Sequence, residues 1–476
     1  MITKQPENWI HGMSMELKEK RKMKKLDLNK IYKGNCLDVL KTFPDESVDM
    51  CITSPPYWGL RSYGTNPVIW DDDGLCEHEW GDNLLHPTRG DRGDKPDSKH
   101  LSAGIKQPTI TDSNLCSKCG AWRGELGLEP NFDLFIKHLC DIFDEVKRVL
   151  KPHGSCWVNL GDTYYTKSGS DFSDTTLVTN EYLTSTGLQK ANKVRDLGLL
   201  PSKCLVQIPN RFSIEMTNRG WTLRNEIIWH KPSCMPSSIK DRYTVDFEKL
   251  FFFTKNRKYH FKQQFEPMVS EPHAPGNKFH KDKVSGPNDR GGKSQWDDTS
   301  RVWSSDRGRN KRTVWSVNPA SFKGAHFATY PPELIDGPIN AGCPSYVCSK
   351  CGKAREEKIE QVKHELSENY TGQGKKDYKS AKAENPSDVK RRVLDSMRTE
   401  NVVVGYTDCG CNEDFVPGVV LDPFIGSGTT AEIAMKQDKN WVGIDLNSDY
   451  IDIADKRLKP TIKEKKTRDK ASEFWG

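Results

Sequence analysis

The chain has 476 residues, of which 35% are hydrophobic and 29% charged, and its formal net charge is +6. The mean hydropathy of −0.75 indicates a polar protein with hydrophilic insertions. The sequence has no apolar run of about 18 residues, which excludes a membrane-spanning helix and a membrane partner. The Lys-rich residues 1–25 lack the apolar stretch of a secretory signal. We therefore expect an intracellular, cytoplasmic protein. The net charge is too small to identify a partner by itself.

Alternating strands and helices predict an α/β core interrupted by polar segments. The apolar run Val48–Thr53 is typical of a strand buried inside a parallel sheet. The other predicted elements, in chain order, are a short strand from Ile31, helices Cys36–Thr42 and Phe132–Leu150, strand Ser155–Leu160, helix Cys204–Gly220, strands Glu226–Trp229 and Lys249–Thr254, and a strand–loop–helix–strand–helix over Val419–Leu458. This order favours a Rossmann-like, mostly parallel, doubly wound sheet.

The last of these segments carries a glycine loop between a strand and a helix. The loop Asp422-Pro-Phe-Ile-Gly-Ser-Gly428 fits, with Ala431, the G-x-G-x-x-A spacing that lets the backbone approach a ligand at a helix N-terminus. Asp445 ends the next predicted strand about 20 residues further on, where its carboxylate can accept both hydroxyls of a ribose. The loop therefore predicts a nucleoside cofactor. A nicotinamide-dependent dehydrogenase would show much the same pattern.

A second motif, Ser54-Pro-Pro-Tyr57, follows the predicted buried strand. Its two prolines each fix φ near −65°, so the loop is rigid and extended. It holds the Ser54 hydroxyl, the Pro55 carbonyl and the Tyr57 ring in a fixed relation. Two acceptors beside an aromatic ring suit a planar amine, which has two N–H groups to donate. The alternative is a proline-rich turn with Tyr57 in the core, and Trp58 either walls a pocket or belongs to that core.

Together the two motifs resemble those of the S-adenosylmethionine-dependent amino-methyltransferases of DNA. Their order, with Ser54–Tyr57 first and the glycine loop near the C-terminus, is similar to that of the β class. The segment Phe322–Leu334 resembles the family segment that closes over the methionine end of the cofactor. The likeness covers the chain outside its polar insertions. One position departs from it, because Asn35 stands where many relatives have an aspartate.

The resemblance implies a methyltransferase fold, S-adenosylmethionine as cofactor and double-stranded DNA as substrate. It also admits a cognate restriction endonuclease as a partner and a nucleoid-associated location through DNA. The implied catalytic residues are Ser54, Pro55, Pro56 and Tyr57. The implied cofactor-binding residues are Asp422, Phe424, Gly426, Ser427, Gly428, Thr429, Thr430, Asp445, His326 and Ala328.

The implied reaction transfers a methyl group from a sulfonium to the exocyclic amine of a flipped base. Ser54 and the Pro55 carbonyl would accept the hydrogens of this amine, and stacking on Tyr57 would contribute about 1–3 kcal/mol. Relatives acting on adenine N6 usually carry Asp or Asn before Pro-Pro, so Ser54 favours N4 of cytosine. Adenine N6, a protein amide and a catalytically inactive zinc-containing DNA-binding protein are the alternatives. Methylation of cytosine C5 is excluded because it needs a Pro-Cys nucleophile, and the chain has no such dipeptide.

The 14 cysteines need an explanation other than disulfides in a reducing compartment. The pentapeptide Cys-Ser-Lys-Cys-Gly occurs twice, and this knuckle presents two thiolates to one tetrahedral zinc. Small polar insertions need such a staple to fold. We predict two structural zinc sites, formed by Cys76, His78, Cys116 and Cys119 and by Cys348, Cys351, Cys409 and Cys411, with Cys343 as a spare. The other cysteines are expected to be buried thiols, namely Cys36, Cys51, Cys140, Cys156, Cys204 and Cys234.

A basic stretch over residues 265–315 is the candidate for contacting DNA. Its Lys and Arg side chains, Arg309 and Arg312 among them, can bind phosphates or guanine edges, and a solvated loop is the alternative.

The sequence predicts a catalytic core that is divided by insertions. The core comprises residues 1–75, 121–264 and 316–342, the last of which closes the cofactor site, and a cofactor-binding part over 413–461. The remaining parts are zinc-binding insertions over 76–120 and 343–412, target recognition over 265–315 and a basic tail over 462–476.

Overall fold

The computed structural model describes residues 25–60, 62, 64–80, 114–165, 200–201, 203–267, 309–319, 330–363 and 399–475. The chain forms two units. The first comprises the described parts of 1–262, 313–347 and 416–476, and the second comprises those of 263–312 and 348–415. Among the described residues, no helix is both long and apolar enough to cross a membrane.

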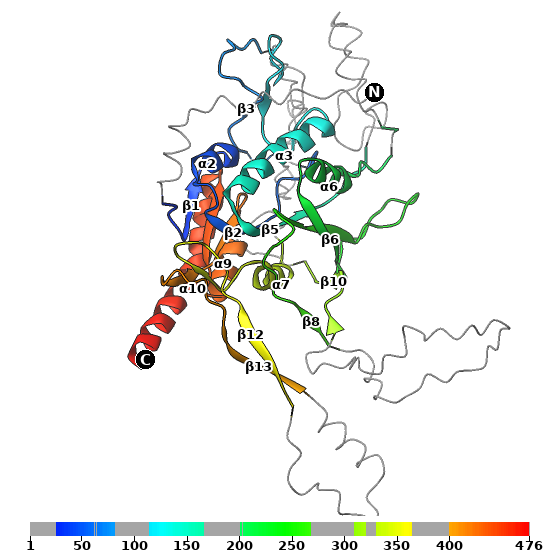
Figure 1. The fold of residues 1–476 in the computed structure, drawn as a ribbon. Helices are drawn as coiled ribbons and strands as arrows, with labels where there is room; N and C mark the ends of the chain where they lie inside the picture. The colour runs from blue at the N-terminus through cyan, green and yellow to red at the C-terminus, as the bar shows by residue number, and fades with distance from the viewer. Residues whose placement is uncertain are drawn as a thin grey trace, which may run out of the picture. The chain divides into compact units, whose positions relative to one another are not determined.

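In the described part of the first unit, eight strands form one sheet in the order β1-β16-β15-β2-β5-β7-β6-β10 (Figure 1). Their bounds are β1 Lys30–Lys33, β2 Val48–Thr53, β5 Leu150–Leu160, β6 Thr222–His230, β7 Phe247–Thr254, β10 Val314–Ser316, β15 Val419–Asp422 and β16 Asn440–Asp445. Neighbouring strands run parallel except where β7 pairs with β5 and β6. The predicted mostly parallel α/β class is therefore confirmed.

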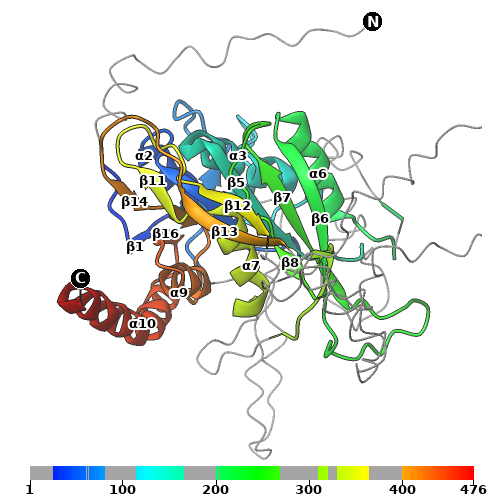
Figure 2. The same cartoon turned by 60° about the horizontal axis from the view of Figure 1, so that its bottom comes forward.

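Helices cover both faces of this sheet (Figure 1 and Figure 2). Alternate residues of β2 show the division, because Cys51 packs on one face and Met50 and Ile52 pack on the other. The first face carries α2 Cys36–Thr42, α3 Phe132–Val149 and α6 Ile208–Asn218. The second face carries α7 Pro332–Gly342, α9 Thr429–Lys436 and α10 Ser448–Trp475. Burial on both faces explains why β2 is mostly apolar, with Asp49 and Thr53 as its buried polar residues.

Several predicted elements differ in extent from the structure, α6 and β5 among them. Helix α6 begins at Ile208 and not at Cys204, because Gln207 has a φ of 63°, which is incompatible with a helix interior. Strand β5 begins at Leu150, directly after α3, and not at Ser155. It is longer than expected because Val48 on β2 pairs with Leu150 at its start.

Two-stranded pairs make up the remaining described strands, and three of these pairs are antiparallel. The first unit contains the pair of β3 Val68–Trp70 with β4 Trp122–Gly124, which flanks the first predicted zinc insertion. The pairs of β8 Phe265–Glu266 with β9 Arg309–Asn310 and of β12 Glu357–Lys363 with β13 Thr399–Tyr406 belong to the second unit. Strand β11 Tyr346–Cys348 pairs with β14 Phe415–Pro417.

The strand directions bring several functional candidates to one edge of the sheet. The parallel strands β1, β2, β5, β15 and β16 all end there, and ligands of such sheets bind outside these carboxyl ends. Because β7 is antiparallel to β5 and β6, its first residues and the end of β6 reach the same edge. Residues from far apart in the sequence are therefore placed around one crevice.

Candidate functional site

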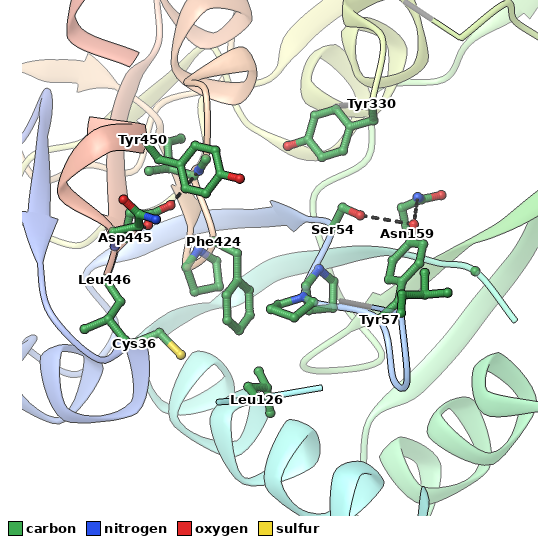
Figure 3. Close-up of a pocket in the computed structure, with 18 of the residues that line it drawn as sticks. Cys36, Ser54, Tyr57, Leu126, Asn159, Tyr330, Phe424, Asp445, Leu446 and Tyr450 are labelled. Atoms are coloured by element: carbon green, nitrogen blue, oxygen red, sulfur yellow. Dashed lines mark hydrogen bonds between the residues drawn. The ribbon is translucent and has the colours of Figure 1, made fainter. Parts of the chain in front are cut away.

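A cavity of about 470 Å³ opens at this edge, within the size range of small-molecule sites. Both sequence motifs line it. The catalytic candidates Ser54, Pro55, Pro56 and Tyr57 and the cofactor-binding candidates Phe424, Gly426, Ser427, Thr429 and Asp445 are all among its lining residues. Figure 3 shows Asp445 and Phe424 on one side of the pocket and Ser54 and Tyr57 on the other. Thus the glycine loop and the Pro-Pro loop face a common space.

Asp422 connects the two motifs directly. Strands β15 and β2 are parallel neighbours, and Leu421 lies opposite Cys51 in register. At the end of this pairing the Thr53 hydroxyl donates to Asp422 Oδ1 at 2.6 Å. The Phe424 N–H donates to the same oxygen at 3.0 Å. Asp422 thereby fixes the start of the glycine loop against the residue that precedes Ser54.

The second carboxylate oxygen of Asp422 holds two further hydroxyls. Thr430 donates to it at 2.5 Å, and the Tyr330 hydroxyl lies 2.9 Å away and also contacts Thr430. Burial raises the pKa of Asp422, while these hydroxyls and the Thr53 hydroxyl oppose the shift. Asp422 and Thr430 do not line the cavity, so they act by fixing the conformation of the glycine loop.

Glycines give the loop its course. Gly426 and Gly428 have φ of 50° and 83°, values that side-chain-bearing residues rarely adopt. A Cβ added at Gly428 would lie 3.1 Å from the Ala454 Cβ, so this glycine also allows the loop to pack against α10. Gly428 is the N-cap of α9, whose first residue, Thr429, lines the cavity. The N-terminus of α9 therefore adjoins the space available to a ligand.

Asp445 lies at the end of β16, beside the glycine loop. Its carboxylate accepts the Gly426 N–H at 2.9 Å and the Asn447 N–H at 2.8 Å, which leaves lone pairs on both oxygens for a ligand. Burial raises the pKa of Asp445 to about 6. Asn35, the position that departs from the family, also lines the cavity, and its side chain caps α2 by accepting from the N–H of Leu37 at 2.9 Å.

The Pro-Pro loop is held by close backbone contacts. A Cβ at Gly161 would lie 2.7 Å from the Tyr57 ring, so only glycine allows the ring its position after β5. The next turn packs on Gly127, whose carbonyl accepts the Gly59 N–H at 2.8 Å. Trp58 is buried, donates Nε1–H to the Glu129 carbonyl at 3.0 Å and is not a lining residue. Of its two predicted alternatives, the structure therefore shows the core position.

Three polar side chains that the sequence analysis did not single out complete this side of the pocket. Asn159 of β5, Glu248 of β7 and Lys231, directly after β6, all line the cavity. The Tyr57 hydroxyl donates to Glu248 Oε2 at 2.8 Å, and Glu248 Oε1 contacts Lys231 Nζ. Figure 3 shows Asn159 and Ser54 on either side of the Tyr57 hydroxyl. In the sequence, the only indication that these three residues belong to the site is their position at or next to the ends of predicted strands.

The first predicted metal set comes together between β3 and β4. The ligand atoms of Cys76, His78, Cys116 and Cys119 lie within 4.8 Å of one another. Cys76 Sγ is 3.9 Å from Cys116 Sγ, and Cys119 Sγ is 3.5 Å from His78 Nδ1. Tetrahedral zinc bonds would separate two sulfurs by about 3.8 Å and a sulfur and a nitrogen by about 3.5 Å. Asp72 lies 3.2 Å from His78 Nε2 and so fixes Nδ1 toward the thiols.

The second set lies in the second unit. Cys348, Cys351, Cys409 and Cys411 also place their sulfurs within 4.8 Å of one another. The two knuckles share one backbone pattern: the carbonyl of the first cysteine accepts the glycine N–H, at 3.0 Å from Gly120 and 2.9 Å from Gly352. Four thiolates, or three thiolates and an imidazole, are ligand sets that fit zinc.

The remaining cysteines divide into two groups. Cys343 is buried and outside the second set of ligand atoms. Cys36, Cys51, Cys140 and Cys156 are buried, as expected. The expectation was wrong for Cys204 and Cys234, which are partly exposed because they lie in the loops before α6 and after β6.

Two groups of predicted residues lie mostly or wholly outside the described chain. His326 and Ala328 fall in the gap at 320–329. Most of the basic stretch over 265–315 is likewise not described. Within its described part, Arg309 and Arg312 each donate Nε–H to Glu266, at 2.8 and 2.6 Å.

Comparison with known proteins identifies the family. A glycine loop at the carboxyl edge of a mostly parallel sheet defines the class of α/β proteins that bind a nucleoside cofactor. Residues 48–456 match the family model for DNA methylase, N6_N4_Mtase. This chain therefore belongs to the N6/N4 DNA methylase family, and the resemblance inferred from its two motifs is confirmed.

Similar proteins cover nearly the whole chain. It is 27% identical over 442 residues to the Type II methyltransferase M.Cfr9I of Citrobacter freundii, covering 91% of this chain and 89% of that one. It is 26% identical over 435 residues to M.XycI of Xanthomonas campestris pv. cyanopsidis, covering 90% and 87%. The solved PvuII DNA methyltransferase, described as cytosine-N4-specific, is 13% identical with a TM-score of 0.41 and covers 90% of this chain and 86% of its own.

Proposed function

We propose that this DNA methyltransferase transfers a methyl group from S-adenosylmethionine to the exocyclic N4 amine of cytosine in duplex DNA. The observation that carries the proposal is the hydrogen bond from Thr53 to Asp422, which joins the Pro-Pro loop to the glycine loop at one cavity. The Type II methyltransferases named above support site-specific modification of DNA, and a cognate restriction endonuclease is the partner expected of such an enzyme.

The residues around the glycine loop fit S-adenosylmethionine. Gly426 and Gly428 allow the backbone to approach the ligand, and the lone pairs of Asp445 suit the two ribose hydroxyls. Phe424, beside the Pro-Pro loop, offers an aromatic face within the same cavity. The cofactor supplies an electrophilic methyl group. His326 and Ala328 stay proposed contacts to its methionine end.

The Pro-Pro loop would bind and orient the target amine. The lone pair of this amine is delocalised into the base, so the amine is a poor nucleophile. Ser54 Oγ and the Pro55 carbonyl would accept its two hydrogens and direct the lone pair at the methyl carbon. The base reaches them by flipping out of the duplex and stacking on Tyr57. Ser54, where relatives acting on adenine N6 usually carry Asp or Asn, supports cytosine.

The two cysteine-containing sets would hold structural zinc. Each supplies four protein ligands, which leaves no coordination position for a reacting water. No cysteine or histidine of either set lines the cavity. Zinc therefore has a folding role in this proposal and no part in methyl transfer. The basic stretch over 265–315 stays the proposed DNA-contacting region.

Nucleoside analysis tests the proposal. The full chain is incubated with duplex DNA and methyl-labelled S-adenosylmethionine, and the DNA is digested and resolved by mass. We expect N4-methylcytosine as the labelled nucleoside. N6-methyladenine would overturn the choice of base, and label found in protein alone would overturn the choice of DNA as substrate.

The pKa of Asp445 predicts a pH dependence of cofactor binding. The carboxylate form accepts both ribose hydroxyls, and its pKa of about 6 means that protonation sets in as the pH falls below neutrality. From pH 8 to pH 5 we expect the affinity for S-adenosylmethionine to fall about tenfold, because roughly one group in eleven stays ionised one unit below the pKa. Isothermal titration calorimetry measures this change.

Two variants check that Asp445 is the source of the pH dependence. Asp445→Asn should bind S-adenosylmethionine weakly at every pH and lose the dependence. Asp449→Asn, an exposed position on α10 that does not line the cavity, should behave like the wild type. A wild-type affinity that is constant over this range would contradict the role given to Asp445.

A further inference from the structure

The side chains behind Ser54 form a continuous hydrogen-bonded network. Ser54 Oγ lies 3.2 Å from Tyr57 Oη, which lies 2.8 Å from Glu248 Oε2. Asn159 Nδ2 lies 2.6 Å from Tyr57 Oη and 2.7 Å from Glu248 Oε2. The other oxygen of Glu248 contacts Lys231 Nζ. Each member lines the cavity, so the network faces the space proposed for the target base.

The direction of these hydrogen bonds follows from the chemistry of Glu248. A carboxylate paired with a lysine accepts hydrogen bonds and has none to donate. Tyr57 has a single hydroxyl proton, and Glu248 Oε2 accepts it. Tyr57 Oη is then an acceptor toward the Asn159 amide and the Ser54 hydroxyl. The proton of Ser54 is therefore directed at Tyr57 and away from the space for the base.

The orientation of the Asn159 amide supports this direction. Its two N–H groups donate to Tyr57 and Glu248, while its Oδ1 is buried and has no hydrogen-bond partner within the described chain. A flipped amide would offer Oδ1 to the Tyr57 proton but would also place it against the Glu248 carboxylate, where two acceptors repel. Glu248 thus fixes an amide orientation that costs one unsatisfied buried acceptor.

We propose that Glu248 is a positioning residue for methyl transfer. By accepting the Tyr57 proton it leaves Ser54 with oxygen lone pairs, and no proton, toward the target amine. The inference rests on the proposed function, in which Ser54 accepts an N–H of that amine. If the network ran in the opposite direction, the Ser54 proton would face the hydrogens of the amine. Glu248 acts here through Tyr57 and not on the reacting atoms.

A double-mutant cycle between Glu248 and Tyr57 tests this inference. In Glu248→Gln the new amide should turn its oxygen to Lys231 and its N–H group to Tyr57, which reverses the network. We expect the single-turnover rate to fall roughly tenfold to hundredfold, as for loss of a hydrogen bond at the reacting atom. The dissociation constants of S-adenosylmethionine and DNA should not change. Tyr57→Phe keeps the stacking ring and should show a similar loss.

The double variant distinguishes positioning from a merely structural role. If Glu248 acts through the Tyr57 hydroxyl, Glu248→Gln should cause no further loss in the Tyr57→Phe background. Glu248→Asp keeps the carboxylate and should recover part of the rate. The matched control is Glu226→Gln, because Glu226 pairs with Lys249 between the same two strands but outside the cavity, and it should keep the full rate.

The contrary results are equally specific. The inference would be overturned if the losses in single-turnover rate multiplied in the double variant. It would also be overturned if Glu248→Gln were as fast as the wild type, or if it lost only DNA affinity. Failure of the proposed function would look different, because the wild type would then transfer no methyl group to cytosine, or Ser54→Ala would stay fully active.

Discussion

Replacing Ser54 by alanine is expected to slow methyl transfer by roughly 10²–10³-fold while S-adenosylmethionine binding stays intact. Loss of one preorganised hydrogen bond at the reacting centre has effects of this size in other enzymes. Ser54 lies at the end of β2 and faces the target side of the cavity, whereas Asp445 and the glycine loop lie on the other side. The change should therefore lower the single-turnover rate at saturating DNA and leave the cofactor dissociation constant unchanged.

A matched serine controls for the loss of a hydroxyl as such. The Ser47 hydroxyl donates to the Pro44 carbonyl at 2.8 Å, and Ser47 lies just before β2, outside the cavity. Ser47→Ala should keep the wild-type rate. If Ser54→Ala instead lost cofactor affinity in proportion to its rate, Ser54 would be a residue that shapes the cofactor site, and the role proposed for it would be wrong.

Much of the fold and of the cofactor side could be predicted because the signals are local. The run Val48–Thr53 is mostly apolar, and its residues are all buried. The glycine spacing and the acid at Asp445 depend on short stretches whose conformation is set by neighbouring residues. The two cysteine sets could be grouped because one knuckle sequence is repeated. In each case the chain itself carries the pattern that the structure then shows.

The Glu248 network could not be predicted because it depends on pairing between distant strands. Glu248 reaches Asn159 only because β7 runs antiparallel to β5, with Leu250 opposite Asn159. The same antiparallel pairing with β6 brings Lys231 beside Glu248. The sequence predicted these segments as strands, and no local pattern shows which of their end residues turn toward the pocket. Strand order and register are long-range properties.

The first predicted metal set has a structural connection to the cavity. The loop that holds it joins β3 and β4, and residues of or beside these strands line the cavity, among them Val68, Trp70 and Leu126. Trp70 and Trp122 stack on the buried His138 ring, with ring centres 4.8 and 5.7 Å away. His138 lies between Glu129 and Asp71, at 3.0 and 3.2 Å. The β3–β4 hairpin thus forms a wall of the pocket. It packs against α3 on one side, and the predicted metal ligands lie in its connecting loop on the other.

Removal of the first metal is therefore expected to lower DNA methylation more than cofactor binding. Structural zinc contributes about 10–16 kcal/mol of apparent binding free energy in small modules, far more than a short hairpin gains from packing. Cys116→Ser should lose this metal, loosen the wall near Trp70 and lower DNA methylation more than about tenfold. Its affinity for S-adenosylmethionine should be close to that of the wild type, because Asp445 and the glycine loop lie on other strands.

Metal analysis by mass spectrometry, a DNA methylation assay and calorimetric titration of the cofactor measure the three parts of this prediction. The wild type should contain two zinc ions per chain, and Cys116→Ser and Cys348→Ser should contain one each, since the two ligand sets are separate. Cys204→Ser, a partly exposed thiol outside both sets, should keep two ions and full activity. A zinc-free wild type that methylates DNA at full rate would show that the thiols are not metal ligands. A Cys116→Ser enzyme that lacks one ion but keeps full activity would show that the pocket wall holds without it.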